Sequence, residues 1–306
     1  MDRPMLLIPL IIAIAACTGA ADVPADLAAD LPAPTVAAAS IAPAPPPVLT
    51  ASAPVAEAGF DHGYATWDAV LRKHVDGRGQ VDYQALAKDA GLARFVADLG
   101  AVPPEEVGGW SRDQQVAFYI NAYNALTFQT IVDALPIGSI MDIKSRKKDP
   151  HDPWEVAKWR LAGRDVSLNW IEHTKLRANL NEPRVHFVLV CAAKGCPTLP
   201  AKAVVPAGLD AQLEGFTRAF FTDTTKNRVD VAGGKVHLSR ILEWYGDDFV
   251  GWAGTPAAPA LEGRPAKEAS SVRLLAKYLP EDVRGFLAAG KFTVAFNDYD
   301  WALNKQ

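Results

Sequence analysis

The segment that decides the fold class is SRDQQVAFYINAYNALTFQTIVDAL, residues 111–135. Ser111 and Gln114 have the spacing of a capping box, which predicts that a helix begins here. Past its first turn the segment is apolar on almost every side, so it predicts a long helix that is buried on more than one face. Asn121 and Asn124 share one face of this helix, and buried amides need hydrogen-bond partners. These two side chains therefore either hold a neighbouring loop or line a site.

Strands are predicted further along the chain, in VHFVLVC (185–191), RVDVAGGKVHL (228–238) and FTVAF (292–296). The first is a continuous apolar run, which is typical of a buried strand. The second predicts a hairpin with a two-residue turn and a register that pairs Val231 with Val236. Because these strands are scattered among helices without a regular βαβ period, the sequence predicts an α+β fold. We expect it to be mostly helical, with a small central sheet and a β-hairpin near 229–238.

The chain begins with MDRPMLLIPLIIAIAACTGA. The apolar run is too short to span a bilayer and has the length of the hydrophobic part of a secretory signal. The tetrapeptide IAAC, which ends at Cys17, resembles a bacterial lipoprotein signal, in which the cysteine is acylated. This predicts a signal over residues 1–17 and a lipid anchor at Cys17, with the protein in the cell envelope, on the outer membrane and facing the periplasm. A cleaved secretory signal with an incidental cysteine is the alternative.

Residues 18–58 are rich in Ala and Pro and contain no Lys, Arg or aromatic residue, so they lack the side chains that build a core. We interpret them as a disordered tether, and residues 59–306 as a single globular domain. The chain has 31 Lys and Arg against 35 Asp and Glu, a formal net charge of −4. Without a basic excess, nucleic acid is not an expected partner. The expected partners are the membrane, through the lipid anchor, and an envelope protein or glycan.

Cys191 and Cys196 are the only cysteines besides Cys17. In an oxidising compartment an even pair predicts a disulfide. If the chain between them were extended, their Cα atoms would be about 16 Å apart, so the loop must fold back for the bond to form. The sharper hypothesis makes Cys196 a nucleophilic thiolate, with Lys194 available to lower its pKa. A redox couple is the third interpretation, and the lack of a C-x-x-C spacing counts against it.

A nucleophilic cysteine needs a base, and His173 or His186 could supply it. In a strand, His186 would lie about 16 Å from Cys191. Glu172 adjoins His173, and adjacent helical side chains project about 100° apart rather than meeting. The predicted catalytic set is Cys196, Cys191, His186, His173 and Glu172. No metal site and no cofactor is predicted, because the sequence has no HExxH, G-x-S-x-G, P-loop or Cys-rich metal knuckle.

Five segments follow one another in a recognisable order: FYINAYNAL (118–126), LNWIEHTKLR (168–177), PRVHFVLVCAAKGCPTLP (183–200), VHLSRILEWYGDDF (236–249) and FNDYDWALN (296–304). Together they resemble the family catalogued as domain of unknown function 547, from about Gly59 to Asn304. Some eukaryotic members of that family are fused to glutaredoxin-like domains, which suggests a connection to thiols.

The resemblance implies that the polar residues at motif positions form either a site or a buried polar network. On this chain they are Glu172, His173, Arg177, Arg184, His186, Cys191, Cys196, Pro197, Tyr299, Asp300, Trp301 and Asn304. Two functions therefore stay open. One is a thiol-dependent hydrolase of the bacterial envelope that acts on peptide or amide bonds, with Cys196 as nucleophile. The other is a non-enzymatic envelope module that binds a protein or glycan, with a structural Cys191–Cys196 disulfide.

Overall fold

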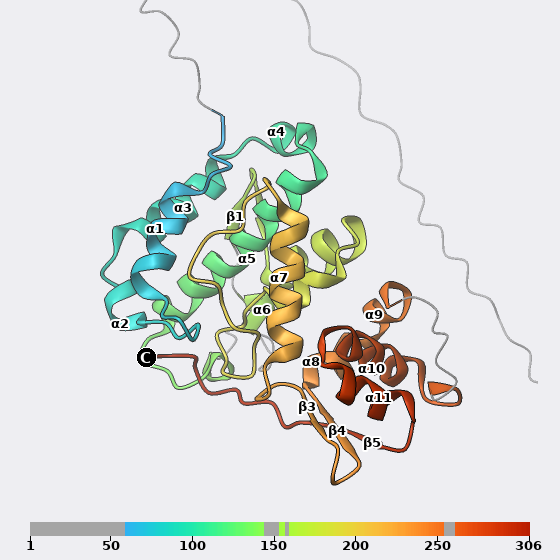
Figure 1. The fold of residues 1–306 in the computed structure, drawn as a ribbon. Coiled ribbons are helices and arrows are strands. Elements are labelled where there is room, and N and C mark those ends of the chain that lie inside the picture. Colours follow the sequence, from blue (N-terminus) through green and yellow to red (C-terminus); the bar gives the residue numbers. More distant parts are fainter. Residues whose placement is uncertain (1–58, 144–152, 157–158, 254–260) are drawn as a thin grey trace, which may run out of the picture. The chain divides into compact units, whose positions relative to one another are not determined.

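The computed structural model describes residues 59–143, 153–156, 159–253 and 261–306 (Figure 1). The predicted lipoprotein signal, the acylated cysteine and the Ala/Pro-rich tether lie outside these residues. Among the helices in the described ranges, none is both long enough and apolar enough to cross a membrane.

Helices make up most of the described residues, which confirms the predicted α+β class (Figure 1). The first group consists of α1 (Ala65–His74), α2 (Tyr83–Leu86), α3 (Ala90–Ala101), α4 (Pro104–Gly109), α5 (Arg112–Ala134), the 3-10 turn η1 (Ile140–Asp142) and α6 (Pro153–Val156). A π-helix, η2 (Trp170–Asn179), and a 3-10 helix, η3 (Pro183–Phe187), follow. The remaining helices are α7 (Leu209–Thr222), α8 (Arg240–Trp244), α9 (Gly246–Trp252), α10 (Ala266–Tyr278) and α11 (Glu281–Ala288).

Two small sheets accompany these helices. Strands β1 (Trp159–Leu161) and β2 (Arg164–Val166) form an antiparallel pair, and in the second sheet β4 (Lys235–Leu238) lies between β3 (Arg228–Asp230) and β5 (Thr293–Phe296). The hairpin near 229–238 is confirmed.

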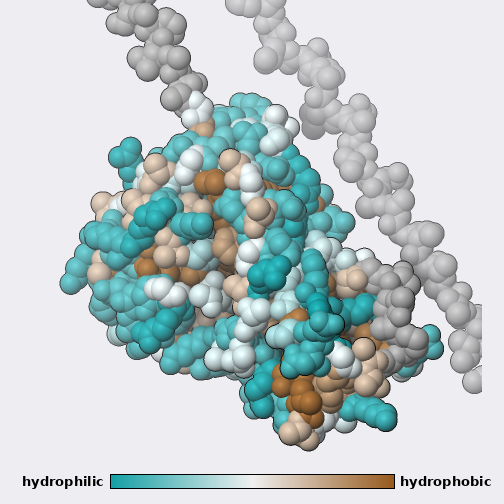
Figure 2. Space-filling view, in the orientation of Figure 1, coloured by the Kyte–Doolittle hydropathy of each residue, from teal (hydrophilic) through white to brown (hydrophobic). Residues whose placement is uncertain are grey.

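The predicted register of the hairpin is wrong, because Val236 pairs with Val229 rather than with Val231. The turn is longer than two residues, and within it the Asp230 carboxylate accepts a hydrogen bond from the Gly233 N–H at 2.8 Å. The shift leaves Val231 in the turn with half of its surface exposed. Figure 2 shows a hydrophobic group in the region of this hairpin, on a face that is otherwise largely hydrophilic.

Helix α5 is buried along most of its length, as its apolar pattern predicts. Its first turn has the predicted capping box: the Ser111 N–H donates to Gln114 Oε1 at 2.9 Å, and the Gln114 N–H donates to Ser111 Oγ at 3.2 Å. The buried Asn121 side chain holds the backbone of Val204, by donating to its carbonyl at 2.7 Å and accepting from its N–H at 3.1 Å. The amides of α5 thus clamp a neighbouring segment.

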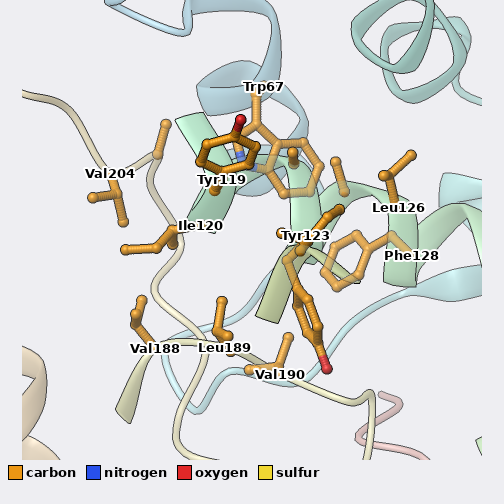
Figure 3. Close-up of a cluster of buried hydrophobic side chains, with 14 of the residues drawn as sticks. Trp67, Tyr119, Ile120, Tyr123, Leu126, Phe128, Val188, Leu189, Val190 and Val204 are labelled. Carbon is orange, nitrogen blue, oxygen red and sulfur yellow. The ribbon is translucent and has the colours of Figure 1, made fainter. Parts of the chain in front are cut away.

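The predicted strand at residues 185–191 is wrong, although the burial that it implied is correct. The segment begins within η3 and then continues as irregular chain, and Val188 and Val190 are fully buried. Asn124 takes the place of a neighbouring strand, because its side chain donates to the Val188 carbonyl at 3.1 Å and accepts from the Val190 N–H at 3.0 Å. Figure 3 shows Val190 beside the ring of Tyr123 of α5. Residues 185–191 therefore belong to neither of the two small sheets in the described part of the chain.

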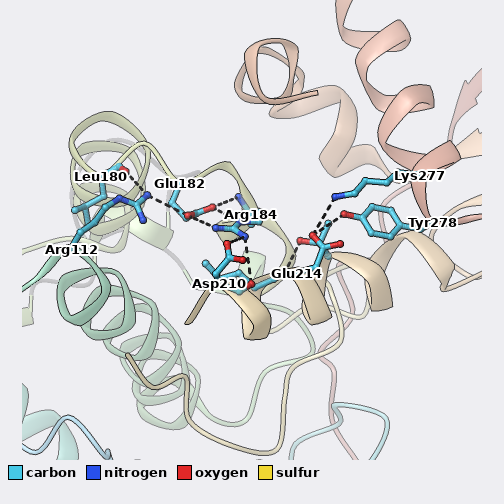
Figure 4. A network of polar contacts seen from close by, with 10 residues as sticks. Arg112, Leu180, Glu182, Arg184, Asp210, Glu214, Lys277 and Tyr278 are labelled. Carbon is cyan, nitrogen blue, oxygen red and sulfur yellow. Dashed lines mark hydrogen bonds and ion pairs between the residues drawn. The ribbon is translucent and has the colours of Figure 1, made fainter. Parts of the chain in front are cut away.

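Ion pairs join α5, η3 and α7 around a buried carboxylate, Glu182, which is 3% exposed. Its oxygens accept hydrogen bonds from Arg184 at 2.7 and 2.9 Å and from Arg112 at 3.3 Å. Arg184 also bonds Asp210 at 2.6 Å (Figure 4). Burial alone would raise the pKa of Glu182, but the hydrogen bonds and charge of Arg184 outweigh it and hold that pKa below its usual value. We call these residues the Glu182 network.

Candidate functional site

A cavity of about 450 Å³ lies between segments that are distant in the sequence. Aromatic and polar side chains line it: Tyr123, Trp154, Asn169, Glu172, His186, Leu189, Cys191, Cys196, Pro197, Ile241, Trp244, Tyr245, Tyr299 and Trp301. Four of the five predicted catalytic residues are in this set. A concave, largely apolar cavity with a few converging polar groups is the usual form of a small-molecule site.

Both cysteines are free thiols in the structure, and their Sγ atoms lie 2.6 Å apart. The loop between them folds back, as the bonded pair would require. Ala192 takes a left-handed conformation at a φ of 61°, and the Cys196 N–H donates to the Ala193 carbonyl at 3.1 Å. At Gly195 a Cβ atom would come within 2.7 Å of the Tyr299 ring, so only glycine lets that ring lie against the loop.

Residues near the end of the chain complete the cysteine loop. The Tyr299 hydroxyl is 3.1 Å from each sulfur. The Gly195 N–H donates to the Asp300 carbonyl at 2.8 Å, and the Asn304 N–H donates to the Ala192 carbonyl at 3.0 Å. The family pattern pointed to Tyr299 and Asn304, and both lie at the loop.

The two thiols differ in acidity. Burial raises the pKa of Cys196, but hydrogen bonds from Cys191, from Tyr299 and from backbone N–H groups outweigh it and lower that pKa to about 7. One of these groups is the Cys191 N–H, which lies 3.0 Å from Cys196 Sγ. The hydrogen bond with Cys196 and burial raise the pKa of Cys191 well above its usual value. At pH 7 Cys196 is therefore about half ionised, and the negative charge of the pair lies on Cys196 rather than on Cys191.

His186 lines the same cavity, which a strand would have prevented. Because η3 is helical, it shortens the distance along the chain to Cys191. The His186 Nε2 atom lies 2.7 Å from Asp248 Oδ2, and its Nδ1 atom lies 3.9 Å from Glu172 Oε1. The ring stacks on Tyr245, with centroids 3.9 Å apart. Both ring nitrogens therefore face carboxylates rather than a sulfur.

Asp248 is bound from two sides. Besides His186, it receives Arg177 through two hydrogen bonds, Nε to Oδ2 at 2.6 Å and Nη2 to Oδ1 at 2.9 Å. Burial would raise the pKa of Asp248, but the hydrogen bonds of His186 and Arg177 lower it well below its usual range. Asp248 therefore stays ionised and fixes the orientation of the imidazole.

Glu172 differs from Asp248 in having no ion pair with Lys or Arg among the described residues, although the charge of Arg177 acts on it. The residue is 5% exposed, and its ion-pair contact in the described part of the chain is with His186 Nδ1 at 3.9 Å. Burial raises the pKa of the Tyr245 hydroxyl, and the nearby charge of Glu172 raises it further. It lies on the π-helix η2, and π-helical segments occur frequently at functional sites.

The structure does not bring His173 to this cavity. Its side chain is exposed, lines a separate hollow and contacts Arg177. Prediction missed the lining residues Tyr245, Trp154 and Trp244, and it missed Asp248, which binds His186 behind the cavity wall. Trp244, Tyr245 and Asp248 lie in WYGDDF (244–249), within a segment that carries the family resemblance, but nothing in the local pattern distinguished them from core residues. For Trp154, the residue type was the only indication in the sequence.

No group of three or more His, Cys, Asp or Glu within the described ranges is arranged to hold a metal ion.

Comparison with known families supports the resemblance. Residues 107–221 match a family model described as "Protein of unknown function, DUF547". The match covers α5, η2, η3 and the cysteine loop, but not the segment with Tyr245 and Asp248 or the residues from Tyr299 on. Neither the curated proteins nor the solved structures gave a match.

Proposed function

We propose that the DUF547 region, completed by the residues that close its cavity, is a thiol-dependent enzyme that exchanges its Cys191–Cys196 pair with disulfide substrates. The observation that carries the proposal is the contact of the two sulfurs, 2.6 Å apart at the wall of the cavity. The pKa of about 7 at Cys196 supports it, because the thiolate is the attacking form and an attacking thiol works best when its pKa is near ambient pH.

The exchange proceeds in two steps. The Cys196 thiolate attacks one sulfur of a substrate disulfide, forms a mixed disulfide and releases the first substrate thiolate. Cys191 then loses its proton and attacks the Cys196 sulfur, which forms the Cys191–Cys196 disulfide and releases the second thiolate. The substrate gains two electrons and the pair loses two. A small thiol such as glutathione returns the pair to the dithiol form for the next turnover.

The experiment uses the full chain with Cys17→Ser, so that only two thiols remain. The reduced protein is mixed with an aromatic disulfide, 5,5′-dithiobis(2-nitrobenzoate), and the released thiolate is counted. We expect two thiolates from this protein, one from the Cys191→Ser variant, which stops at the mixed disulfide, and a much slower reaction from Cys196→Ser. The initial rate should rise with pH about a midpoint near 7. If neither sulfur reacts before the protein is denatured, the proposal is wrong.

A second candidate is the hydrolase predicted from the sequence, and the position of His186 favours it. That imidazole is oriented by Asp248 and lines the cavity that holds Cys196. In this reaction Cys196 attacks the carbonyl carbon of a peptide or amide, His186 donates a proton to the leaving amine, and water hydrolyses the thioester. The variant Cys191→Ala separates the candidates, because amide hydrolysis would survive it and catalytic disulfide exchange would not.

A non-enzymatic module that binds a protein or glycan would use the same pair as a structural disulfide. Then Cys196→Ala would mainly destabilise the fold, by about 2 to 4 kcal/mol, and the bond would resist glutathione. A Cys196→Ala variant that keeps the melting temperature of the parent supports the exchange reaction instead.

We also propose that the protein is an envelope lipoprotein anchored through Cys17 and facing the periplasm. The support is the sequence IAAC at the end of the apolar run. In a bacterial host, Cys17→Ala should move the protein from the membrane fraction to the soluble fraction. Equal membrane association of the variant and the parent would contradict the anchor.

A further inference from the structure

We propose that the cavity recognises a primary ammonium group on its substrate, with Glu172 as the counter-ion and the tryptophans and tyrosines as the surrounding wall. This inference deepens the proposed function, since it assigns a substrate class to the same cavity. The chemistry is that of an alkylamine, such as the end of a lysine side chain.

The first support is the state of Glu172. Its side chain is 6% exposed, and it lines the cavity. A buried carboxylate is unfavourable unless hydrogen bonds and an opposite charge compensate it. The Tyr245 hydroxyl and the His186 Nδ1 atom at 3.9 Å are its polar neighbours, so it can still accept hydrogen bonds from a ligand.

The second support is that the guanidinium of Arg177, whose charge acts on Glu172, is already bound. Arg177 gives two hydrogen bonds to Asp248 and contacts His173, and Asp248 also holds His186. In the molecules in which Cys196 is ionised, about half of them at pH 7, its thiolate adds a further negative charge to the cavity wall. Two tyrosines of the cavity wall respond to the negative charge. Burial raises the pKa of Tyr123 and of Tyr245 most, and the negative charge of Glu172 raises both pKa values further.

The third support is the aromatic wall. Trp301 lies at its centre, with ring centroids 4.6 Å from Tyr299, 5.8 Å from Trp244 and 6.0 Å from Trp154. Trp244 is 46% exposed, which places it at the opening of the cavity. Aromatic faces attract cations, and Trp does so most strongly. A sugar could also stack on these rings, but a neutral sugar would leave the charge of Glu172 uncompensated.

The experiment is a ligand-observed NMR titration of n-butylammonium against the reduced full chain with Cys17→Ser, at constant ionic strength. We expect saturable binding of n-butylammonium and no saturable binding of 1-butanol, which has the same alkyl chain without the charge. Glu172→Gln should weaken ammonium binding at least about tenfold. Trp244→Leu, at a residue that is 46% exposed, should weaken it by a smaller factor.

The matched control is Asp247→Asn, which removes one negative charge from α9 at a side chain that is 76% exposed and pairs with Lys267. It should bind n-butylammonium as the parent does. Equal binding of 1-butanol, or equal ammonium binding by Glu172→Gln, would overturn the inference. Binding of N-acetylglucosamine that does not depend on Glu172 would overturn it in favour of a glycan site.

The titration is repeated with Cys196→Ser, which has no nucleophile. If the parent protein performs no disulfide exchange but Cys196→Ser still binds n-butylammonium, the proposed function is wrong and the ammonium site stands. Exchange by the parent without ammonium binding would contradict the ammonium site alone.

Discussion

The Glu182 network and the cavity around Glu172 each contain a carboxylate that is almost completely buried, at 3% and 5% exposure. Glu182 accepts hydrogen bonds from two arginines, whereas Glu172 has no ion pair with Lys or Arg among the described residues. A buried charge is costly unless it is paired. The difference indicates that arginines of the fold neutralise the charge of Glu182. In our proposal, a bound ligand neutralises the charge of Glu172. We therefore expect substitutions to affect stability in the first region and binding in the second.

The largest effect is expected at Glu182. The change Glu182→Gln leaves Arg184, whose side chain is 15% exposed, without its main counter-charge, so it should lower the free energy of unfolding by about 3 kcal/mol. Urea denaturation measures the loss. The control is Asp165→Asn, which breaks an exposed pair with Arg160 and should change stability by less than about 1 kcal/mol. If both variants lose the same free energy of unfolding, the buried pair of Glu182 is no more important for stability than an exposed pair.

The same network predicts the response to acid. The pKa of Glu182 is lower in the folded protein than in the unfolded chain, so its contribution is fully present above the ordinary pKa of about 4 and is lost as the pH falls through the folded value. Melting temperatures measured from pH 6 to pH 3 should therefore fall less steeply in Glu182→Gln than in the parent protein. A steeper fall in the variant would show that the sign is wrong.

A substitution at Asn124 tests whether the segment that ends at Cys191 is held in place by α5. Removing its amide leaves the buried Val188 carbonyl and Val190 N–H without partners, so Asn124→Ala should cost about 2 kcal/mol. It should also change the reactivity of Cys191, because the anchored segment ends there. Thermal denaturation and alkylation measured on the same samples test both effects. A loss of stability with unchanged thiol reactivity would mean that the loop is held in place by the tail alone.

A substitution at Tyr299 should change the pKa of Cys196 more than it changes the stability of the protein. The change Tyr299→Phe removes a hydrogen-bond donor at 3.1 Å from Cys196 Sγ, so the pKa of Cys196 should rise above about 7. At pH 7 we expect alkylation by iodoacetamide to slow by up to about tenfold. Tyr278→Phe, at a hydroxyl that bonds Glu214, is the control and should leave the rate unchanged.

The smallest effect on stability is expected at Glu172. Because no ion pair with Lys or Arg is lost and a buried charge is removed, Glu172→Gln should change the free energy of unfolding by less than about 1 kcal/mol in either direction. Urea denaturation beside Glu182→Gln gives the direct comparison. A loss as large as that at Glu182 would mean that Glu172 is also part of the framework.

Local patterns in the sequence were sufficient for some elements and insufficient for others. The capping box and the apolar run predicted α5, and the Gly-Gly turn predicted the hairpin. The run at 185–191 predicted burial, but its backbone conformation depends on Asn124, which lies more than sixty residues earlier. An apolar run identifies a buried segment and does not identify what completes its hydrogen bonds.

The candidate site divides in the same way. Cys191, Cys196, Glu172 and His186 were predicted from residue type and motif position, and the structure places all four at one cavity. Asp248 and Tyr245 were missed, because their role comes from contact with His186 across the fold. His173 is adjacent to Glu172 in sequence, yet it faces solvent, as the angle between neighbouring helical residues requires.

The dependence of the cysteine loop on Tyr299 has a consequence for synthesis of the chain. Tyr299 follows Cys191 by 108 residues, so at translation rates of about 5 to 20 residues per second the two thiols are made roughly 5 to 20 s before their hydrogen-bond partner. During that interval Cys196 lacks the donor that helps lower its pKa, and the loop that holds the two sulfurs lacks the Tyr299 ring that packs against it. The order of synthesis thus makes the reactive pair one of the last parts of the molecule to mature.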